Sequence, residues 1–166
     1  IPASGGPTAI VADAPNPRGG AWSAENVIVF APDFQNGLFR VPAAGGTAAP
    51  PTQIESNKHS THRWPVFLPD GKHFLFLATN HAGGDPSANG IYYASIDGGE
   101  PRLLVACSSN ALYANGQILY HAQTALMAQP FEPASGKLLG DPTALIDGVQ
   151  FDSGVWRAVA SVSDTG

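Results

Sequence analysis

Three arginines, Arg18, Arg63 and Arg157, each stand at or just before a segment that is expected to form the first β-strand of a repeated unit. Asn110 holds the corresponding place before a further segment of this kind, and Arg157 lies about one position out of register. A guanidinium offers fixed, paired donors that fit a carboxylate or a phosphate group. If the fold gathers these positions at one rim, they form a binding site for an anion or an acidic partner. The alternative is that each arginine pairs with an acidic residue of a neighbouring part of the fold and is purely structural.

Trp64 follows Arg63 directly, so it is the aromatic residue that we expect at the same rim. The other aromatic residues alternate with smaller side chains, and this pattern favours burial between packed sheets. They are Trp22, Phe67, Phe74, Phe76, Tyr92, Tyr113 and Trp156. The predicted binding positions are therefore Arg18, Arg63, Trp64, Asn110 and Arg157.

No catalytic motif accompanies these positions. The sequence contains no Gly-x-Ser-x-Gly pentapeptide, so it offers no nucleophile elbow of the α/β-hydrolase kind. Its aspartates stand mostly at predicted turns, where Asp has a structural reason to be. These aspartates are Asp70, Asp97, Asp141, Asp147 and Asp164. We therefore expect a chain that is not itself an enzyme and that uses no cofactor.

Two histidines, His59 and His62, are the candidate metal ligands, and His81 stands in a second polar stretch. A His-x-x-His pair supplies two ligands, whereas a zinc site needs three or four that converge. No third ligand stands nearby in the sequence. The sequence therefore predicts solvent-exposed loop histidines and no metal site.

The composition excludes several classes of partner. Charged residues make up 13% of the 166 residues and the formal net charge is −5. The sequence therefore lacks the excess of basic residues that nucleic-acid binding needs. The single cysteine, Cys107, cannot form an internal disulfide. No apolar run approaches the roughly 18 residues of a membrane-spanning helix, and we expect this segment to make no membrane contact. The first residues lack the basic and apolar regions of a signal peptide.

The elements that must position the arginines are short strands joined by tight turns. Asp70-Gly71, between two aromatic runs, predicts a β-hairpin. Similar turns are expected at Asn26, Gly116 and Gly166, and a second set of turns at Gly5, Gly45, Gly98 and Gly136. Both sets recur about every 40 to 50 residues, which with four strands per repeat is typical of β-propeller blades. A β-sandwich is the alternative, but it does not require two turn types to alternate in step.

The sequence thus predicts an all-β chain, a β-propeller segment of about three four-stranded blades with partial blades at both ends. Residues 1–14 end one blade, with a strand over 8–12, and residues 150–166 begin another, with a strand over 156–162. The blades between them are 15–54, whose last strand is expected near 51–54, then 55–106 and 107–149. Closed propellers have about four to eight blades. We therefore expect a fragment of a larger protein, or self-association through open blade edges.

The hairpin over residues 67–76 resembles the "SPDG" hairpin of TolB-type, WD40-like (PD40) propeller repeats. Residues 16–22, 62–65, 90–101 and 126–131 are similar to the C-terminal propeller region of bacterial, acidobacterial-type serine/threonine protein kinases. The resemblance implies a sensor or partner-binding propeller on the extracytoplasmic or periplasmic side of a bacterial membrane protein. None of the kinase chemistry lies here, because the chain has no Gly-rich nucleotide loop, no His-Arg-Asp and no Asp-Phe-Gly.

Two functions remain open from the sequence. The first is a non-catalytic propeller module that binds a protein partner or senses a small anionic ligand, within a larger, kinase-linked protein. The second is the accessory propeller of a hydrolase, peptidase or lyase whose chemistry lies outside this segment.

Overall fold

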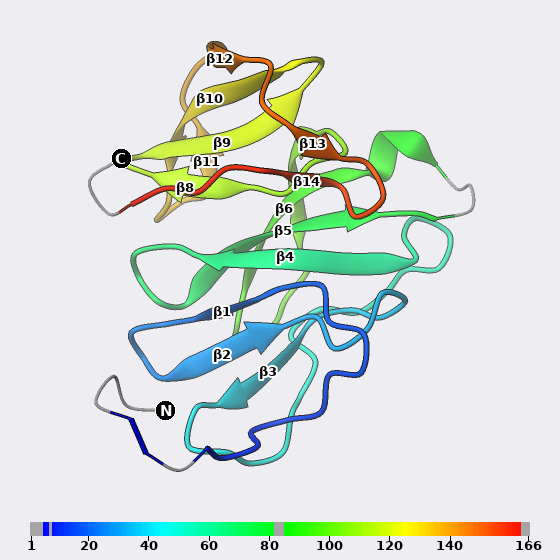
Figure 1. Cartoon of the computed structure of the whole chain (residues 1–166), viewed down its shortest axis with the longest axis vertical. Helices are drawn as coiled ribbons and strands as arrows, with labels where there is room; N and C mark the ends of the chain where they lie inside the picture. Colours follow the sequence, from blue (N-terminus) through cyan, green and yellow to red (C-terminus); the bar gives the residue numbers. More distant parts are fainter. Residues whose placement is uncertain (1–4, 7, 82–84, 164–166) are drawn as a thin grey trace.

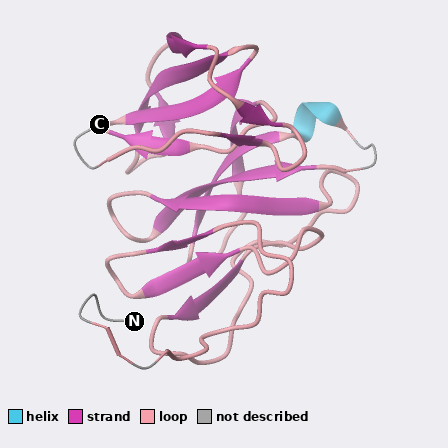
Figure 2. Cartoon of the chain, in the orientation of Figure 1, coloured by secondary structure: helices cyan, strands magenta, loops and turns pink. Residues whose placement is uncertain are grey.

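The computed structural model of the chain describes residues 5, 6, 8–81 and 85–163. These residues form short antiparallel strands and loops, with a single turn of 3-10 helix (η1, Pro86–Ala88) as the helical exception within the described part (Figure 2). The sheets lie one above another along the long axis of the molecule (Figure 1). This architecture confirms the predicted all-β fold class. Among the described residues, no helix has the length and apolar character needed to cross a membrane.

The second sheet is the most regular part of the fold. Its four strands are β4 (Thr61–Phe67), β5 (His73–Thr79), β6 (Gly90–Ser95) and β7 (Arg102–Ala106), and each pairs antiparallel with the next. The predicted hairpin turn joins β4 to β5. Asp70 Oδ1 accepts hydrogen bonds from the backbone of Lys72 (3.0 Å) and His73 (2.9 Å), and Gly71 adopts φ 68°, which glycine reaches without strain.

The two predicted sets of turns are confirmed where the structure describes the residues around them, and at Gly5 only the backbone conformation of such a turn is seen. All have positive φ: Asn26, Gly71 and Gly116 in the first set, and Gly5, Gly45, Gly98 and Gly136 in the second. The predicted turn at Gly166, with Asp164, lies outside the described residues. Two turn types therefore alternate along the chain, as a repeated four-stranded unit requires.

The third sheet contains β8 (Leu112–Ala114), β9 (Gln117–Ala122) and β10 (Ala125–Glu132). Its outer position is shared by β11 (Lys137–Leu138) and β12 (Thr143–Asp147), which pair with opposite ends of β10. The predicted strand near residues 143–146 is therefore present as β12. The third sheet reproduces the order of the second, with an interrupted last strand.

The first sheet differs from the prediction because it has three strands, β1 (Gly20–Trp22), β2 (Val27–Phe30) and β3 (Phe39–Pro42). The strand expected near residues 51–54 is absent, and only a bridge between Arg40 and Ala49 stands in its place. Pro50 and Pro51 follow directly, and proline has no N–H to continue the ladder. The strand expected over residues 8–12 is also absent, since its described residues have no neighbouring strand to pair with.

The C-terminal segment, residues 149–163, falls in the stretch 150–166 that the sequence predicts to begin a new blade with a strand over 156–162. The structure has instead a small hairpin of β13 (Phe151–Asp152) and β14 (Arg157–Ala158). The rest of the segment runs beside β8 without strand pairing (Figure 1). Val149, Ala160 and Val162 pack against Leu119, Leu126 and Ala128 of the third sheet. The segment therefore covers the free face of that sheet. The predicted blade boundaries stay a prediction.

Two apolar layers hold the sheets together. One lies between the first and second sheets, where Val29 and Leu38 pack with Phe74 and Phe76. The other lies between the second and third sheets, around Leu75, Ile91, Ile118 and Phe131. Burial of these side chains, each worth roughly 1.5–3 kcal/mol, is the main stabilising contribution. The expected burial of aromatic residues is wrong for Trp22, which is 60% exposed at the end of the edge strand β1.

Candidate binding site

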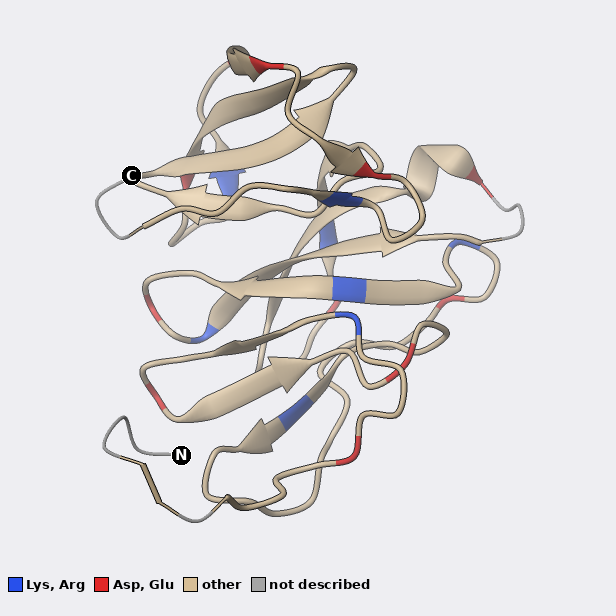
Figure 3. Ribbon diagram, in the orientation of Figure 1, with Lys and Arg blue, Asp and Glu red and all other residues tan. Residues whose placement is uncertain are grey.

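The fold brings the predicted positions into contact through backbone hydrogen bonds. The N–H of Trp64 donates to the carbonyl of Arg18 (2.8 Å), which joins the second sheet to the loop before β1. The N–H of Asn110 donates to the carbonyl of Trp156 (3.1 Å), and its side-chain oxygen accepts from the N–H of Ala158 (2.7 Å). Asn110 therefore ties the C-terminal segment to the third sheet. The basic residues of β4, β14 and the loop before β1 lie in one column of the molecule (Figure 3).

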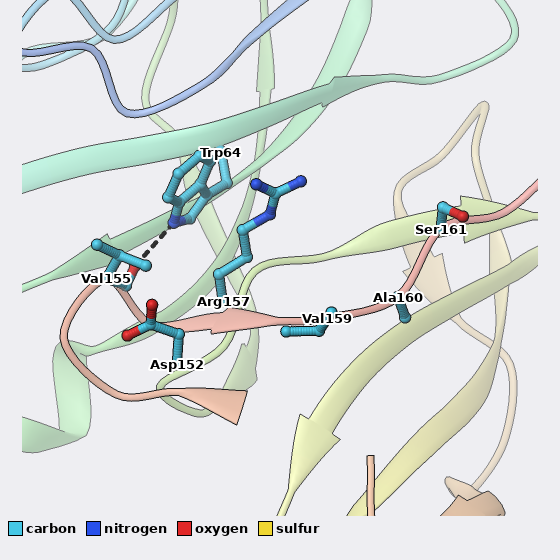
Figure 4. Close-up of a pocket in the computed structure, with 7 residues that line it drawn as sticks. All are labelled: Trp64, Asp152, Val155, Arg157, Val159, Ala160 and Ser161. Carbon is cyan, nitrogen blue, oxygen red and sulfur yellow. Dashed lines mark hydrogen bonds between the residues drawn. The ribbon is translucent and has the colours of Figure 1, made fainter. Parts of the chain in front are cut away.

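Two Arg–Trp dipeptides, Arg63-Trp64 and Trp156-Arg157, contact each other reciprocally. The guanidinium of Arg63 lies 4.6 Å from the ring centroid of Trp156, and that of Arg157 lies 5.0 Å from the ring of Trp64. Each arginine therefore makes a cation–π contact with the tryptophan of the other dipeptide. The Trp64 indole N–H also donates to the Val155 carbonyl at 2.9 Å (Figure 4).

Both tryptophans occupy unusual backbone positions. Trp64 has φ 53° and Trp156 has φ 56°, a left-handed conformation that bulky residues rarely adopt. At Trp64 the pairing of β4 with β5 is also irregular, with a register shift between Arg63 and Val66. A bulge of this kind redirects a side chain. Here it accompanies an indole that extends from β4 toward the C-terminal segment.

Arg63 is buried, with 1% of its surface exposed. Its guanidinium donates to the hydroxyl of Thr61 (3.0 and 3.2 Å), to His81 Nε2 (3.0 Å) and to the carbonyls of Phe34 and Val155 (3.5 Å each). Burial and the nearby Arg18 lower the pKa of Arg63 to about 10, so it stays a cation at neutral pH. A buried cation that is held by this many acceptors is a structural tie between three parts of the chain.

The acidic partners that the structural alternative requires are not found among the described residues. Among the described residues, the ion pairs are Lys58–Glu55 and His73–Asp70, and neither involves an arginine. Arg18 donates to the carbonyls of Asn16 (3.3 Å) and Pro17 (2.9 Å), and its Nε is buried without a partner. The structural alternative required each arginine to pair with a carboxylate. The described residues do not show these pairs.

A groove of about 430 Å³ opens beside Trp64. Its walls come from Trp64 on one side and from the C-terminal segment on the other, namely Asp152, Val155, Arg157, Val159, Ala160 and Ser161 (Figure 4). Arg157 is exposed, and no described residue offers its guanidinium a hydrogen-bond acceptor. The groove thus presents a cation on an aromatic surface, with small apolar side chains and the carboxylate of Asp152 in the same walls.

The predicted exposure of His59 and His62 is wrong, because their side chains are 4% and 2% exposed. His59 Nε2 lies 2.9 Å from the carbonyl of Ala88 and 3.2 Å from the hydroxyl of Tyr92, while His62 Nδ1 lies 2.9 Å from Thr52 Oγ1. Burial, followed by the charge of His59, lowers the pKa of His62 to about 3. These histidines belong to a packed polar core, and the described residues contain no group of three potential metal ligands.

Sequence reasoning missed His81 and the carbonyl of Val155 as members of this site. His81, which follows the end of β5, contacts Arg63 from 18 positions along the chain, and Val155 contacts it from 92 positions along. A backbone carbonyl leaves no signal in a sequence. The sequence shows His81 in a polar stretch, but it does not show that Arg63 is the partner of this histidine.

Comparison with known proteins bears on the fold. No protein-family model and no curated protein matches this sequence. Among solved structures, puromycin hydrolase superposes on 80% of this chain with a TM-score of 0.58 and 18% sequence identity. This likeness shows the fold alone. The chain spans 24% of the length of puromycin hydrolase, so it corresponds to about a quarter of that protein.

Proposed function

We propose that this chain is a non-catalytic β-propeller module that binds a carboxylate-bearing ligand, or an acidic residue of a protein partner, in the Trp64–Arg157 groove. The observation that carries the proposal is the exposed guanidinium of Arg157. It lies on the ring of Trp64 and has no hydrogen-bond acceptor among the described residues. A carboxylate would supply two acceptors in the plane of the guanidinium.

The surrounding residues support an anion rather than a cation. Arg63 and Arg18 lie close enough for Arg18 to lower the pKa of Arg63, and no described carboxylate pairs with either. Among the described residues, Asp152 is the carboxylate that lines the groove, and its Oδ1 accepts a hydrogen bond from the N–H of Gly154, so Arg18, Arg63 and Arg157 outnumber it at this end of a chain with net charge −5. The field of these cations would attract an anion toward the groove. The walls formed by Val155, Val159 and Ala160 would contact an apolar part of the same ligand.

The test uses citrate as a carboxylate probe and inorganic phosphate as a second anion, in calorimetric titrations at low ionic strength. We expect citrate to bind, and Arg157→Gln to weaken its affinity at least tenfold. Arg102→Gln is the matched control, because Arg102 also lies over an aromatic ring but already donates to the carbonyls of Ser135 and Gly136. Equal citrate binding by the Arg157 variant and the parent chain would contradict the proposal.

A more specific form of this proposal is that the module is the sensor of a kinase-linked protein. It is supported by the resemblance of residues 16–22, 62–65, 90–101 and 126–131 to kinase-associated propellers. In that setting a ligand at the groove would be the signal, and the catalytic domain would lie elsewhere in the protein.

The second candidate is an accessory propeller of a hydrolase, favoured by the structural likeness to puromycin hydrolase. In this case the groove would guide a substrate to a catalytic domain outside this segment. The complete gene separates the two candidates. An upstream kinase domain with a membrane span supports the first, and a downstream α/β-hydrolase domain supports the second.

A further inference from the structure

His81 makes an unusual contact with Arg63, at 3.0 Å from its Nε2 to a guanidinium nitrogen. A guanidinium only donates hydrogen bonds, so His81 Nε2 must be unprotonated and act as the acceptor. The proton of the neutral ring is then on Nδ1, which lies 2.8 Å from the hydroxyl of Ser60. The contact thus fixes both the neutral form and the tautomer of His81.

His81 also lies directly against the C-terminal segment. Its ring centroid is 5.2 Å from that of Trp156 and 5.7 Å from that of Phe34. Arg63, on the other side of His81, lies over the Trp156 ring and donates to the Val155 carbonyl. His81 therefore supports Val155 and Trp156 both by its own ring contact and through Arg63. These two residues lead into Arg157, and Val155 is part of the groove wall.

We infer that His81 is a proton-sensitive positioning residue: while it is neutral it holds the C-terminal segment against Trp64, and when it is protonated the segment releases and the groove opens. The importance of this movement for ligand binding rests on the function proposed above. The movement itself depends only on the contacts of His81, Arg63 and Trp156.

The charges that face His81 make the protonated form unfavourable in the closed arrangement. Arg63 approaches it from β4 and Arg18 from the loop before β1, while Ser60, Phe34 and Trp156 contribute no charge. Burial first, and then these two arginines, lower the pKa of His81 below its usual value of 6.5. An open segment would release His81 toward that ordinary value. The closed arrangement is therefore fully stable above pH 6.5 and loses stability as the pH falls below it.

The C-terminal segment is the part that can move in response. Arg63 is buried and bonded twice to Thr61 in its own strand, so it cannot leave without exposing unpaired donors. The segment is held at Val155 by a long 3.5 Å contact from Arg63 and by the indole of Trp64. Its strand pairing covers only two residues on each side, Phe151–Asp152 with Arg157–Ala158. The hydrogen bonds of Asn110 with Trp156 and Ala158 anchor the segment to the third sheet, so the opening is confined to the turn around Val155, where few hydrogen bonds resist it.

Tryptophan fluorescence tests this movement in a Trp22→Phe background, where Trp64 and Trp156 are the remaining tryptophans. Between pH 8 and pH 5 we expect a reversible red shift of emission and at least a twofold increase in acrylamide quenching, with a midpoint below pH 6.5. His81→Gln supplies a neutral acceptor to Arg63 and should abolish the transition. His81→Lys should give the open, strongly quenched state already at pH 8.

Two histidine variants serve as controls. His73 lies at the β4–β5 turn beside Asp70, and His121 stacks on Phe151 at 4.6 Å on the other side of the C-terminal segment. His73→Gln and His121→Gln should keep the parent transition. The inference is overturned if fluorescence does not change, if His81→Gln keeps the transition, or if circular dichroism shows global unfolding over the same range. Citrate titration of His81→Gln at pH 8 tests the proposed binding function separately, since fluorescence requires no ligand.

Discussion

The two Arg–Trp dipeptides have the same composition and contact each other, yet they occupy opposite environments. Arg63 is buried and its donors have protein acceptors, whereas Arg157 is exposed and its guanidinium has only the face of an indole. The difference follows from their elements. β4 lies between two neighbouring sheets, while β14 belongs to a two-residue hairpin at the surface. Arginines at similar positions of the predicted repeat can therefore be structural in one part of the fold and available for binding in another.

The largest expected effect comes from Arg63. Arg63→Met removes a buried cation and leaves the hydroxyl of Thr61 and the carbonyls of Phe34 and Val155 without their donor. We expect the free energy of unfolding to fall by about 3 kcal/mol. Urea denaturation measures this change, and Arg157→Met is the control. A loss below about 1 kcal/mol would mean that Arg63 contributes no more to the free energy of unfolding than Arg157 does.

The burial of His62 can be tested through the pH dependence of stability. His62 has a pKa of about 3 in the folded chain and ordinarily 6.5, so the unfolded chain binds a proton that the folded chain does not. Stability is therefore fully present above pH 6.5 and falls by about 1.4 kcal/mol per pH unit toward pH 3.

Urea unfolding at pH 6.0, 5.25 and 4.5 measures this slope in a His81→Gln background, which removes the contribution of His81. The range stops at pH 4.5 because the lowered pKa values of Asp70 and Asp85 add their own losses of stability at lower pH. A flat profile would show that His62 is not buried as a neutral ring.

A substitution at Gly19 tests how rigidly the indole ring of Trp64 is held by its surroundings. A methyl group at Gly19 would lie 2.6 Å from Cε3 of Trp64, at a backbone φ of +90°. Gly45 has nearly the same φ (+92°) but open space around it. We expect Gly45→Ala to cost about 1 kcal/mol for backbone strain alone. Gly19→Ala should cost about 1 kcal/mol more and shift the fluorescence of Trp64. Equal costs would indicate that Trp64 moves aside freely.

The smallest stability effect is expected at Arg157. Arg157→Met removes an exposed cation–π contact, so the free energy of unfolding should change by less than about 1 kcal/mol. The same variant should nevertheless lose citrate binding. A large loss of stability here, measured by urea denaturation, would remove the distinction between the two arginines.

The local turns could be predicted because their chemistry is local. Asp70-Gly71 and Asn115-Gly116 form turns since their own side chains and φ values permit it, with Asn115 at φ 47° and Gly116 at φ 73°. The alternation of the two turn types gave the repeat, and the repeat placed Arg18, Arg63 and Arg157 at corresponding positions. The missing strand of the first sheet was also foreseeable, because Pro50-Pro51 cannot continue a ladder.

The burial of individual polar residues was not predictable from the same information. His59 and His62 lie in a polar stretch, but Thr52, Ala88 and Tyr92 supply their partners from positions far along the chain. By itself the sequence determined an all-β chain, its turns and a set of arginines in repeat register. Only the tertiary structure decided that Arg63 is enclosed by Thr61, His81 and Trp156 while Arg157 stays free. Burial depends on which distant segments meet, and a repeat specifies positions without specifying what covers them.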